Sequence, residues 1–326
     1  MWGLKRLLKM VTSGIVIVFA AMMGSYVWLV PDLPVLDETA RLRIPKNIRG
    51  DFVRLTDGVT HYQWRGAQDA TPIVLVHGFA NASYTFGPIA DFLVDQNFRV
   101  LTYDLYGRGL SDRPDGPYDL ELFDRQLTEL LDAEGTSEPI HLLGYSFGGA
   151  IVANFAGTQS KRLKSIIFIA PAGSSPPPSK GGVSYFVSAV TTPILGDWVM
   201  HVLGPRLVGG TRVALGATSL PDRFWILSDQ QERYAGYYGA LLSTIRNAPV
   251  FGGAAAIYKK VGKTDIPVFT IWGEDDHQAA FAQWVDLKRS IPQLEIHAIP
   301  DADHSLPYAQ PDLVNAALMD WMSRKR

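Results

Sequence analysis

A serine placed between glycines marks the junction of an apolar strand and a helix. Residues 141–157 read HLLGYSFGGAIVANFAG, so Ser146 follows a strand-like segment and precedes a helix-like one. Gly144 and Gly148 lack the Cβ atoms that would clash as the strand folds over the helix. This context is typical of a sharp turn that lifts a serine hydroxyl above a sheet edge, where it can attack a carbonyl. The pattern predicts Ser146 as a nucleophile; a glycine-rich turn with an incidental serine is the alternative.

A serine hydroxyl is a weak nucleophile at neutral pH and needs a neighbouring base. His304 lies in IPDADHSLPYAQP, on the expected loop between the last strand and the last helix. Loops at such positions carry function on a rigid scaffold. The other histidines fall within expected strands, at a helix start, in a second motif or in a strand-poor segment. We therefore predict His304 as the base; a solvated loop histidine is the alternative.

The base in turn needs a carboxylate that orients it. Three acidic residues follow a buried strand in VFTIWGEDDHQ, namely Glu274, Asp275 and Asp276. Only one of three adjacent carboxylates can serve one imidazole, and the others are expected to be solvated or to cap the next helix. Asp301 and Asp303 also neighbour the histidine, but residues so close in sequence seldom present a side chain correctly across a site. These residues alone leave the choice within residues 274–276 open.

A carbonyl under attack develops negative charge on its oxygen, which backbone N–H groups can stabilise. The amide of Phe147, at the start of the helix after the serine, is one expected donor. The segment IVLVHGFANASY runs from a strand to a helix, and the amide of Phe79 is the second expected donor. Ser83 in the same segment is predicted to cap the helix that follows.

Short apolar segments alternate with longer amphipathic ones along the rest of the chain. Eight segments indicate strands: 52–55, 61–65, 72–77, 99–103, 140–143, 165–169, 267–272 and 294–298. Five indicate helices: 84–95, 119–132, 147–159, 278–291 and 311–324. The early strands alternate polar and apolar residues and the later ones are uniformly apolar, which indicates an α/β domain with a mostly parallel sheet.

Residues 171–261 interrupt this alternation. The segment begins near SSPPPSKGG, contains no clear strand and is rich in Trp, Tyr, Leu and Gly. We expect a mainly helical cap over the carboxyl edge of the sheet, where ligands of open α/β sheets bind. Four cap aromatics, together with Phe79 and Phe147, are expected to line an acyl pocket: Trp198, Trp225, Tyr234 and Tyr237. Ordinary packing within the cap is the alternative for each.

The chain begins with an apolar segment long enough to cross a membrane. Residues 10–30 contain no charged residue and follow Lys5, Arg6 and Lys9. A helix of this length spans about 30 Å, roughly the hydrocarbon core of a bilayer. Aromatic residues near its far end suit the membrane interface. We predict an uncleaved transmembrane anchor; a cleaved signal peptide and a buried helix are the alternatives.

The charges that flank this segment predict the side of the membrane on which the body lies. Basic residues precede the segment, whereas Asp32, Asp37 and Glu38 follow it. Because the positive flank of a span faces the cytoplasm, the body is expected on the outer, periplasmic or extracytoplasmic, side. Four basic residues further along weaken this prediction and could instead rest on anionic headgroups: Arg41, Arg43, Lys46 and Arg49.

The overall composition excludes several kinds of chemistry. The 326 residues include no cysteine, which excludes disulfides, thiolate catalysis and cysteine-ligated metals. A net charge of −2 provides no long-range attraction to nucleic acid, so no nucleic-acid partner is expected. The 47% hydrophobic content suffices for one large domain, or for a domain with an insertion.

Five motifs together resemble the α/β-hydrolase superfamily, over nearly everything after residue 50. They are VHGF (76–79), DLYGRGLSDRP (104–114), GYSFGG (144–149), WGEDD (272–276) and DADH (301–304). With serine rather than aspartate at position 146, the chain is similar to the serine esterase and lipase branch, which includes membrane-anchored monoacylglycerol lipases. The resemblance favours Asp276 over Asp275 as the acid and implies a structural role for Asp104.

This resemblance implies an α/β-hydrolase fold: a mostly parallel eight-stranded sheet flanked by helices, with a helical cap insertion and an N-terminal transmembrane helix. The expected organisation is a basic tail (1–9), an anchor (10–30), a linker (31–50), a core (51–170 and 262–326) and a cap (171–261).

The resemblance also implies cleavage of carboxylic esters, lipid-type or medium-chain, through Ser146, His304 and Asp276 and an acyl-enzyme. No metal or organic cofactor is expected. The expected partners are a small-molecule or lipid ester and the membrane. The alternatives are C–C bond hydrolysis or cofactor-free perhydrolysis on the same triad, and a non-catalytic binding protein.

Overall fold

The computed structural model describes residues 2–44, 50–177, 179–207 and 222–325 of the chain. Its eight strands form one sheet in the order β1-β2-β4-β3-β5-β6-β7-β8. They are β1 (Asp51–Arg54), β2 (Val59–Arg65), β3 (Thr71–Val76), β4 (Phe98–Tyr103), β5 (Ile140–Tyr145), β6 (Leu163–Ile169), β7 (Val268–Gly273) and β8 (Glu295–Ile299). β2 pairs antiparallel with β1 and β4, and the other pairs of this sheet are parallel. The predicted mostly parallel eight-stranded sheet is confirmed.

The central strands are buried on both faces, which explains their uniformly apolar sequences. All residues of β5 and β7 are buried, whereas β1 and β2 at one edge keep partly exposed residues. A parallel sheet needs helices on both faces to bury such strands. The carboxyl ends of the parallel strands therefore form an edge on which loops can converge.

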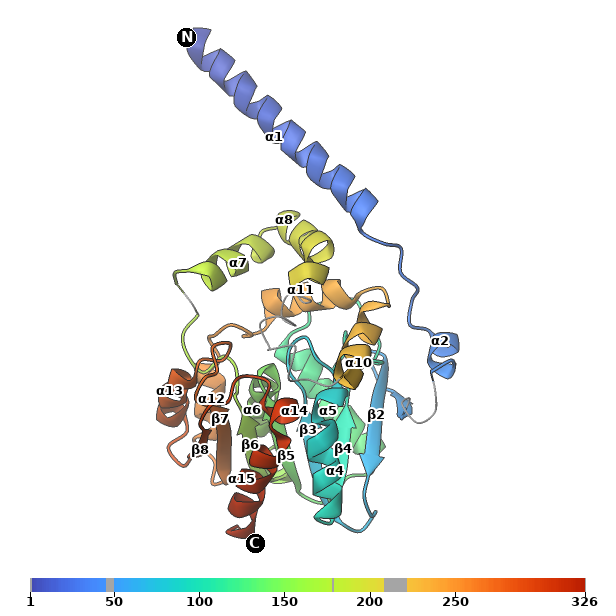
Figure 1. The fold of residues 1–326 in the computed structure, drawn as a ribbon, viewed down its shortest axis with the longest axis vertical. Helices are drawn as coiled ribbons and strands as arrows, with labels where there is room; N and C mark the ends of the chain where they lie inside the picture. The colour runs from blue at the N-terminus through green and yellow to red at the C-terminus, as the bar shows by residue number, and fades with distance from the viewer. Residues whose placement is uncertain (1, 45–49, 178, 208–221, 326) are drawn as a thin grey trace.

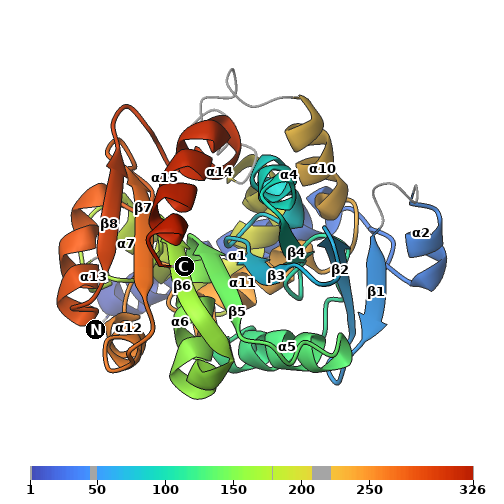
Figure 2. The ribbon, with the colours of Figure 1, turned by 90° about the horizontal axis from the view of Figure 1, so that it is seen from below.

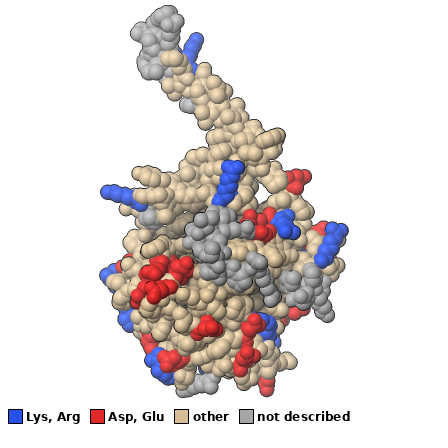
Figure 3. Space-filling view, viewed as in Figure 1, with Lys and Arg blue, Asp and Glu red and all other residues tan. Residues whose placement is uncertain are grey.

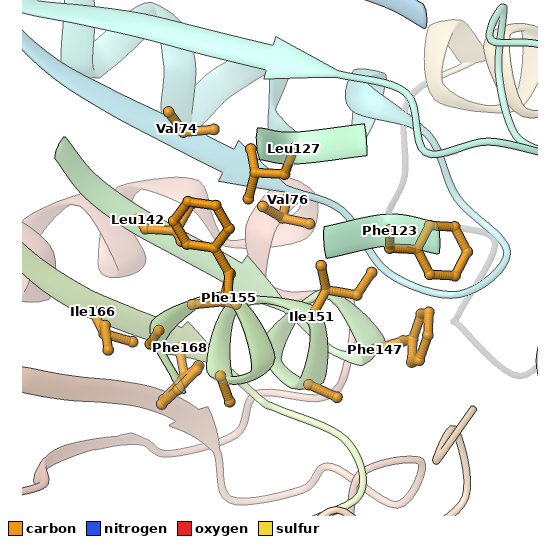
Figure 4. Packing of buried hydrophobic residues seen from close by; sticks show 14 of the residues in the cluster. Val74, Val76, Phe123, Leu127, Leu142, Phe147, Ile151, Phe155, Ile166 and Phe168 are labelled. Atoms are coloured by element: carbon orange, nitrogen blue, oxygen red, sulfur yellow. The ribbon is translucent and has the colours of Figure 1, made fainter. Parts of the chain in front are cut away.

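Helices cover both faces of the sheet (Figure 2). One face carries α4 (Gly87–Asp95), α14 (Leu306–Ala309) and α15 (Pro311–Ser323), and the other carries α5 (Leu120–Ala133), α6 (Phe147–Gln159) and α12 (Ala255–Val261). Figure 4 shows the core beneath α6, where Ile151 and Phe155 of the helix lie with Val76 and Phe168 of the sheet. This packing fixes α6, and therefore its first residue, at the sheet edge.

One predicted helix differs at its start. The segment 84–95 consists of a 3-10 turn, η1 (Ser83–Phe86), followed by α4. Ser83 does not cap this helix, so that prediction is wrong. Ser83 is the first residue of the turn, with Ala82 at the cap position, and its backbone N–H donates to Oδ1 of Asp104 at 2.8 Å.

The predicted helix 278–291 also begins later. It consists of a 3-10 turn, η4 (Phe281–Gln283), followed by α13 (Trp284–Ser290). The helix starts later because Oδ1 of Asp276 accepts from the amides of Gln278 and Ala279 and holds this part of the chain in a turn.

The segment predicted as a cap is helical and lies beyond the carboxyl edge of the sheet (Figure 1). Its elements are α7 (Gly182–Thr191), α8 (Leu195–Trp198), the π-helix η3 (Val199–Leu203), α10 (Asp222–Glu232) and α11 (Tyr237–Asn247). No strand occurs in the described part of 171–261; residues 178 and 208–221 lie outside it. The extent of the insertion stays a prediction, and its last helix, α12, packs against α6 of the core.

The first helix, α1 (Trp2–Leu29), projects away from the body (Figures 1 and 3). Among the described residues, its stretch Lys9–Leu29 is the one helical segment long and apolar enough to cross a membrane unbroken. The end of α1 contacts η3 and the residue before it. Nε1–H of Trp198 donates to Oγ of Ser25 at 2.8 Å.

After α1 the chain crosses to the far edge of the sheet, where α2 (Glu38–Leu42) lies near β1 (Figure 1). Arg41 of α2 is buried, donates to the carbonyl of Leu110 and pairs with Asp112. It is therefore not available to lipid headgroups, which corrects one alternative for the residues after the anchor. Arg43 is exposed. The other two basic residues predicted near the headgroups are Lys46 and Arg49, which lie outside the described residues.

Candidate active site

Ser146 occupies a backbone conformation that non-glycine residues rarely adopt. Its φ is 53° and its ψ is −122°, between the last residue of β5 and the first of α6. A Cβ on Gly144 would lie 2.5 Å from the carbonyl oxygen of Gly148, and a Cβ on Gly148 would lie 2.2 Å from that of Val76. The turn therefore requires glycine on both sides of the serine, as the sequence pattern indicated.

His304 lies between Ser146 and Asp276. Its Nε2 is 2.9 Å from Oγ of Ser146, and its Nδ1 is 2.7 Å from Oδ2 of Asp276. The imidazole and the carboxylate are both buried, while the serine is partly exposed. The Nδ1–H therefore donates to the carboxylate, and Nε2 is left to accept the hydrogen of the serine hydroxyl. The three residues predicted from the sequence lie together in one hydrogen-bonded chain.

The carboxylate of Asp276 is held on both of its oxygens. Oδ2 faces the imidazole, and Oδ1 accepts from the amides of Gln278 and Ala279 at 2.8 and 2.9 Å. Its neighbours Glu274 and Asp275 are exposed. The structure therefore puts Asp276, and not Asp275, against the imidazole.

The acidic residues just before the histidine face elsewhere. Oδ1 of Asp303 accepts from the backbone N–H of Ser305 at 2.8 Å, so this carboxylate closes a turn of its own loop. Asp301 is exposed, with a φ of 52°.

Tyr145 supports the histidine loop, a role that no pattern in the sequence predicted. Its hydroxyl donates to the carbonyl of His304 at 2.6 Å, and the two rings lie 5.1 Å apart. Burial raises the pKa of the tyrosine well above its usual value, so the hydroxyl keeps its proton and remains a donor. The only signal in the sequence was an aromatic residue directly before the serine.

The loop after β3 lies against the serine. A Cβ on Gly78 would come within 3.2 Å of Cβ of Ser146. The next residue, Phe79, has no acceptor for its backbone N–H among the described residues. The N–H of Phe147, the first residue of α6, likewise has no partner within its helix. Within the described residues, both N–H groups are therefore free to donate to a bound group, and their role as oxyanion donors stays a prediction.

The peptide that carries the Phe79 amide is held from behind by His77. Nδ1–H of His77 donates to the carbonyl of Gly78 at 2.9 Å, and Nε2 accepts from the amide of Leu105 at 2.9 Å. Burial lowers the pKa of His77 to about 4, which keeps the imidazole neutral with one donor and one acceptor nitrogen. Because the peptide group is planar, fixing the Gly78 carbonyl fixes the direction of the Phe79 N–H.

The next two carbonyls of the loop are also held. Nε–H of Arg108 donates to the carbonyl of Phe79 at 2.9 Å, and Nη2–H donates to Oγ1 of Thr244 in α11. The hydroxyl of Tyr237 donates to the carbonyl of Ala80 at 2.8 Å. Since two of these partners lie on α11, the cap takes part in fixing the loop.

Asp104 has a structural position near this loop. It is buried and accepts from Nδ1–H of His61 at 2.7 Å and from the amides of Ser83 and Leu110 at 2.8 Å. Burial alone raises the pKa of this carboxyl, but the imidazoles of His61 and His77 and the hydrogen bonds outweigh it and hold the pKa well below its usual range. Asp104 does not line the cavity at Ser146.

A cavity of about 220 Å³ opens beside Ser146 and His304. Its apolar lining comes from the loop after β3 and from the cap: Phe79, Phe186, Met200, Leu207, Leu241 and Ile245. Most of these are aliphatic residues of α11 and of the segment around η3. The one sequence signal for them is the helical spacing of Leu241 and Ile245 on one face, which is equally typical of core residues.

The four cap aromatics predicted for the acyl pocket do not line this cavity, which corrects that prediction. The indole of Trp198 faces Ser25 of α1, and the hydroxyl of Tyr237 is used on the carbonyl of Ala80. In both residues the polar group is thus used in a hydrogen bond, and neither residue lines the cavity.

The remaining two cap aromatics pack with other residues. Trp225 lies edge-on to Phe224 with ring centres 5.1 Å apart, and Tyr234 lies 6.0 Å from the guanidinium of Arg113. Phe147, also predicted for the pocket, is fully buried beneath Phe79. Ordinary packing therefore accounts for these three side chains.

Comparison with known proteins decides the family. The model of the alpha/beta hydrolase family matches residues 73–317, most of the chain. The chain belongs to the alpha/beta hydrolase family. Lipase 3 of Moraxella sp. (strain TA144) is similar to this hydrolase, with 27% identity over 247 residues, 72% of this chain and 71% of the lipase. An AB hydrolase superfamily protein of Bacillus subtilis (strain 168) is 24% identical over 295 residues, 85% of this chain and 99% of that protein.

Solved structures share the fold of this hydrolase. A thermophilic esterase from Thermogutta terrifontis superimposes with a TM-score of 0.68 at 20% identity, covering 85% of this chain and 99% of the esterase. An esterase from Exiguobacterium antarcticum superimposes with a TM-score of 0.69 at 17% identity, covering 84% and 99%. The expected α/β-hydrolase fold is confirmed. Within the part of the chain that the structure describes, no three His, Asp or Glu side chains are grouped to hold a metal ion.

Proposed function

We propose that this hydrolase cleaves carboxylic esters with Ser146 as nucleophile, His304 as base and Asp276 as the acid that orients the base. One observation carries the proposal: Nε2 and Nδ1 of a single buried imidazole lie within hydrogen-bond distance of a strained serine and a fixed carboxylate. The order nucleophile, acid, histidine along the chain suits the α/β-hydrolase arrangement. The names of the relatives, lipase and esterase, agree with it.

The first half of the reaction forms an acyl-enzyme. His304 takes the hydroxyl proton of Ser146 as Oγ attacks the ester carbonyl, and the amides of Phe79 and Phe147 stabilise the oxyanion. The carboxylate of Asp276 stabilises the imidazolium. His304 then gives its proton to the leaving alcohol, the ester C–O bond breaks, and the acyl group stays on the serine.

Water completes the cycle on the same residues. His304 removes a proton from a water molecule, which attacks the acyl carbonyl in the same oxyanion site. The imidazolium returns the proton to Oγ of Ser146 as the acid product leaves. Neither half requires a group beyond the chain and water.

The substrate class proposed is a lipid-type or medium-chain ester. Apolar residues of the loop after β3 and of the cap line the cavity beside the serine and suit an acyl chain. We further propose that α1 is retained as a single-pass membrane anchor, with the body on the outer side as the flanking charges indicate. An anchored enzyme meets lipid-soluble esters at high local concentration.

A panel of p-nitrophenyl esters and monoacylglycerols, with a fluorophosphonate label, tests this function. The full chain in detergent should hydrolyse members of both sets and take up the label, and Ser146→Ala should lose both properties. Labelling without ester turnover would contradict ester hydrolysis and would favour C–C hydrolysis or perhydrolysis on the same residues. The absence of both labelling and turnover would favour a binding protein.

A further inference from the structure

Part of the cap presents apolar side chains to the outside. On α7 and the turn that follows it, Val183 is 49% exposed, Tyr185 76% and Ile194 55%. We call these three residues the cap face. From residue 181 to residue 196 the sequence contains no Asp, Glu, Lys or Arg. Val183 and Tyr185 are two positions apart and so lie on different sides of α7. Exposed apolar residues on more than one side of an uncharged helix suit contact with an apolar phase rather than with water alone.

The shape of this region suits the surface of a bilayer rather than its interior. The helical stretches Gly182–Thr191 and Leu195–Leu207 together are apolar enough for a membrane span, but they meet at an angle of 112°. A helix pair bent so sharply cannot cross as one rod, whereas it can lie with one side in the interface. Exposed basic residues lie at its two ends, Lys180 just before the first stretch and Arg206 in the last turn of the second, as expected beside anionic headgroups.

The contact between α1 and the cap sets the depth of the cap face. Ser25 bonds to Trp198, and the ring of Tyr26 lies 5.7 Å from that of His201. Ser25 precedes the end of α1 at Leu29 by about one helical turn, or about 6 Å along the axis. If α1 spans a membrane, the cap residues that it touches therefore lie about 6 Å inside the end of the span, near the boundary between headgroups and acyl chains.

The views of the molecule agree with this placement. Figure 1 shows α7 and α8 on the side of the body from which α1 leaves, and Figure 3 shows a mostly uncharged surface there. Most of the acidic side chains visible in Figure 3 lie over the body, and a few lie beside the foot of α1. The same part of the cap supplies Phe186, Met200 and Leu207 to the cavity beside the serine.

We propose that the cap face rests in the lipid–water interface of the membrane that α1 crosses. The occupant of this surface is the bilayer itself. The inference rests on the proposed anchor and ester substrate and deepens them, because a lipid ester then enters the cavity from the bilayer, past Phe186 and Met200, without passing through water. The cap is thus a second membrane contact of the chain, beside α1.

The absence of cysteine in this chain allows a direct test. Four single cysteines, each labelled with an environment-sensitive fluorophore, are compared in the full chain, reconstituted in vesicles of equal parts phosphatidylcholine and phosphatidylglycerol. Tyr185→Cys and Ile194→Cys report on the cap face, and Ile17→Cys, at a 68% exposed position of α1, reports on the span. Leu313→Cys, at a 49% exposed position of α15, is the matched control.

Nitroxides on the lipid acyl chains should quench the labels at 17, 185 and 194 and leave the label at 313 accessible to aqueous iodide. A quenched label at 17 with iodide-accessible labels at 185 and 194 would overturn the interfacial cap alone. An iodide-accessible label at 17 would overturn the anchor and the cap contact together. Labels at 185 and 194 protected from both quenchers would assign the face to a protein partner and overturn the proposal.

Turnover provides a second readout. The triple variant Val183→Ser, Tyr185→Ser, Ile194→Ser should lower kcat/KM for a vesicle-embedded monoacylglycerol about tenfold or more, with little change for a soluble short-chain ester. A control triple on the body replaces similarly exposed residues: Val285→Ser, Ile296→Ser and Leu313→Ser. Equal rates for both triples on the embedded ester would contradict the inference. If the wild-type chain hydrolyses neither ester, the proposed function fails, while the quenching result still decides the cap contact.

Discussion

The Nε2 atom of His304 lies 2.9 Å from the Oγ atom of Ser146, although 158 residues separate them in the sequence. The contact exists because β5 and β8 run parallel in one sheet, so that their carboxyl ends meet at the same edge. Asp276 lies on the loop after β7, a strand between β5 and β8, and completes the hydrogen-bonded chain. The sheet thus positions all three side chains, and the predictions below test what each part contributes.

The first prediction concerns the acid. Asp276→Asn should lower kcat about 10⁴-fold. The amides of Gln278 and Ala279 keep the remaining oxygen, so the new NH₂ group faces Nδ1 as a donor and favours the wrong tautomer of the imidazole. Asp275→Asn is the matched control: its side chain is exposed, so kcat should change less than about twofold. Steady-state kinetics on one p-nitrophenyl ester suffices. Similar losses in the two variants would mean that the carboxylate has been misassigned.

The second prediction concerns the backbone donor at residue 79. Phe79→Pro removes the N–H and should lower kcat about 10²-fold or more. Phe79→Ala keeps the N–H and should mainly change the preference for acyl groups, because the ring lines the cavity. Circular dichroism establishes that both variants fold. Equal losses of kcat would exclude this amide as an oxyanion donor.

The third prediction concerns the contact between the cap and the oxyanion loop. Tyr237→Phe removes the hydroxyl that donates to the carbonyl of Ala80 and should lower kcat about fivefold with little change in KM, the effect of one lost hydrogen bond on the loop. Tyr238→Phe is the control on the same helix, since its hydroxyl donates to Glu232 instead. A change confined to KM would show that Tyr237 shapes the pocket without positioning the loop.

The fourth prediction concerns pH and stability. The pKa of His77 is about 4 in the folded chain because of burial, below the ordinary value of about 6.5 in the unfolded chain. As the pH falls below about 6.5, the unfolded chain binds a proton that the folded chain does not, so the free energy of unfolding decreases. Between about pH 7 and about pH 5 this one group should remove about 2 kcal/mol.

Urea unfolding of the full chain in detergent at these two pH values measures the effect. His77→Gln has no titrating group at this position and should show a smaller loss of stability over the same interval. An equal pH dependence in the variant and the wild type would mean that the buried imidazole is not held neutral in the fold.

The local features of the site follow from the sequence because local sterics decide them. The glycines beside Ser146 leave room for carbonyl oxygens at distances that no Cβ tolerates. The sharp turn therefore needs glycine at these positions, and the glycines in turn predict the turn. Apolar strands separated by helices are likewise sufficient to predict a parallel sheet and to bring its loops to one edge. The choice of Asp276 over Asp275 needed the turn in which the amides of Gln278 and Ala279 orient the carboxylate.

The positions of the cap aromatics could not be predicted in the same way. Trp198 turns toward Ser25, a partner 173 residues away, and Tyr237 turns toward Ala80, 157 residues away. Each direction depends on tertiary packing that no local pattern contains. The cavity is lined instead by Leu241 and Ile245, whose spacing alone does not distinguish core from pocket.

The central claim is that Ser146 carries the acyl group during turnover. Rapid-quench mass spectrometry of the full chain with a p-nitrophenyl ester tests it most directly. The peptide containing Ser146 should gain the mass of the acyl group before the steady state, and Ser146→Ala should show no such adduct. Steady hydrolysis by the wild-type chain without an acylated Ser146 peptide, or with the adduct on another residue, would contradict it.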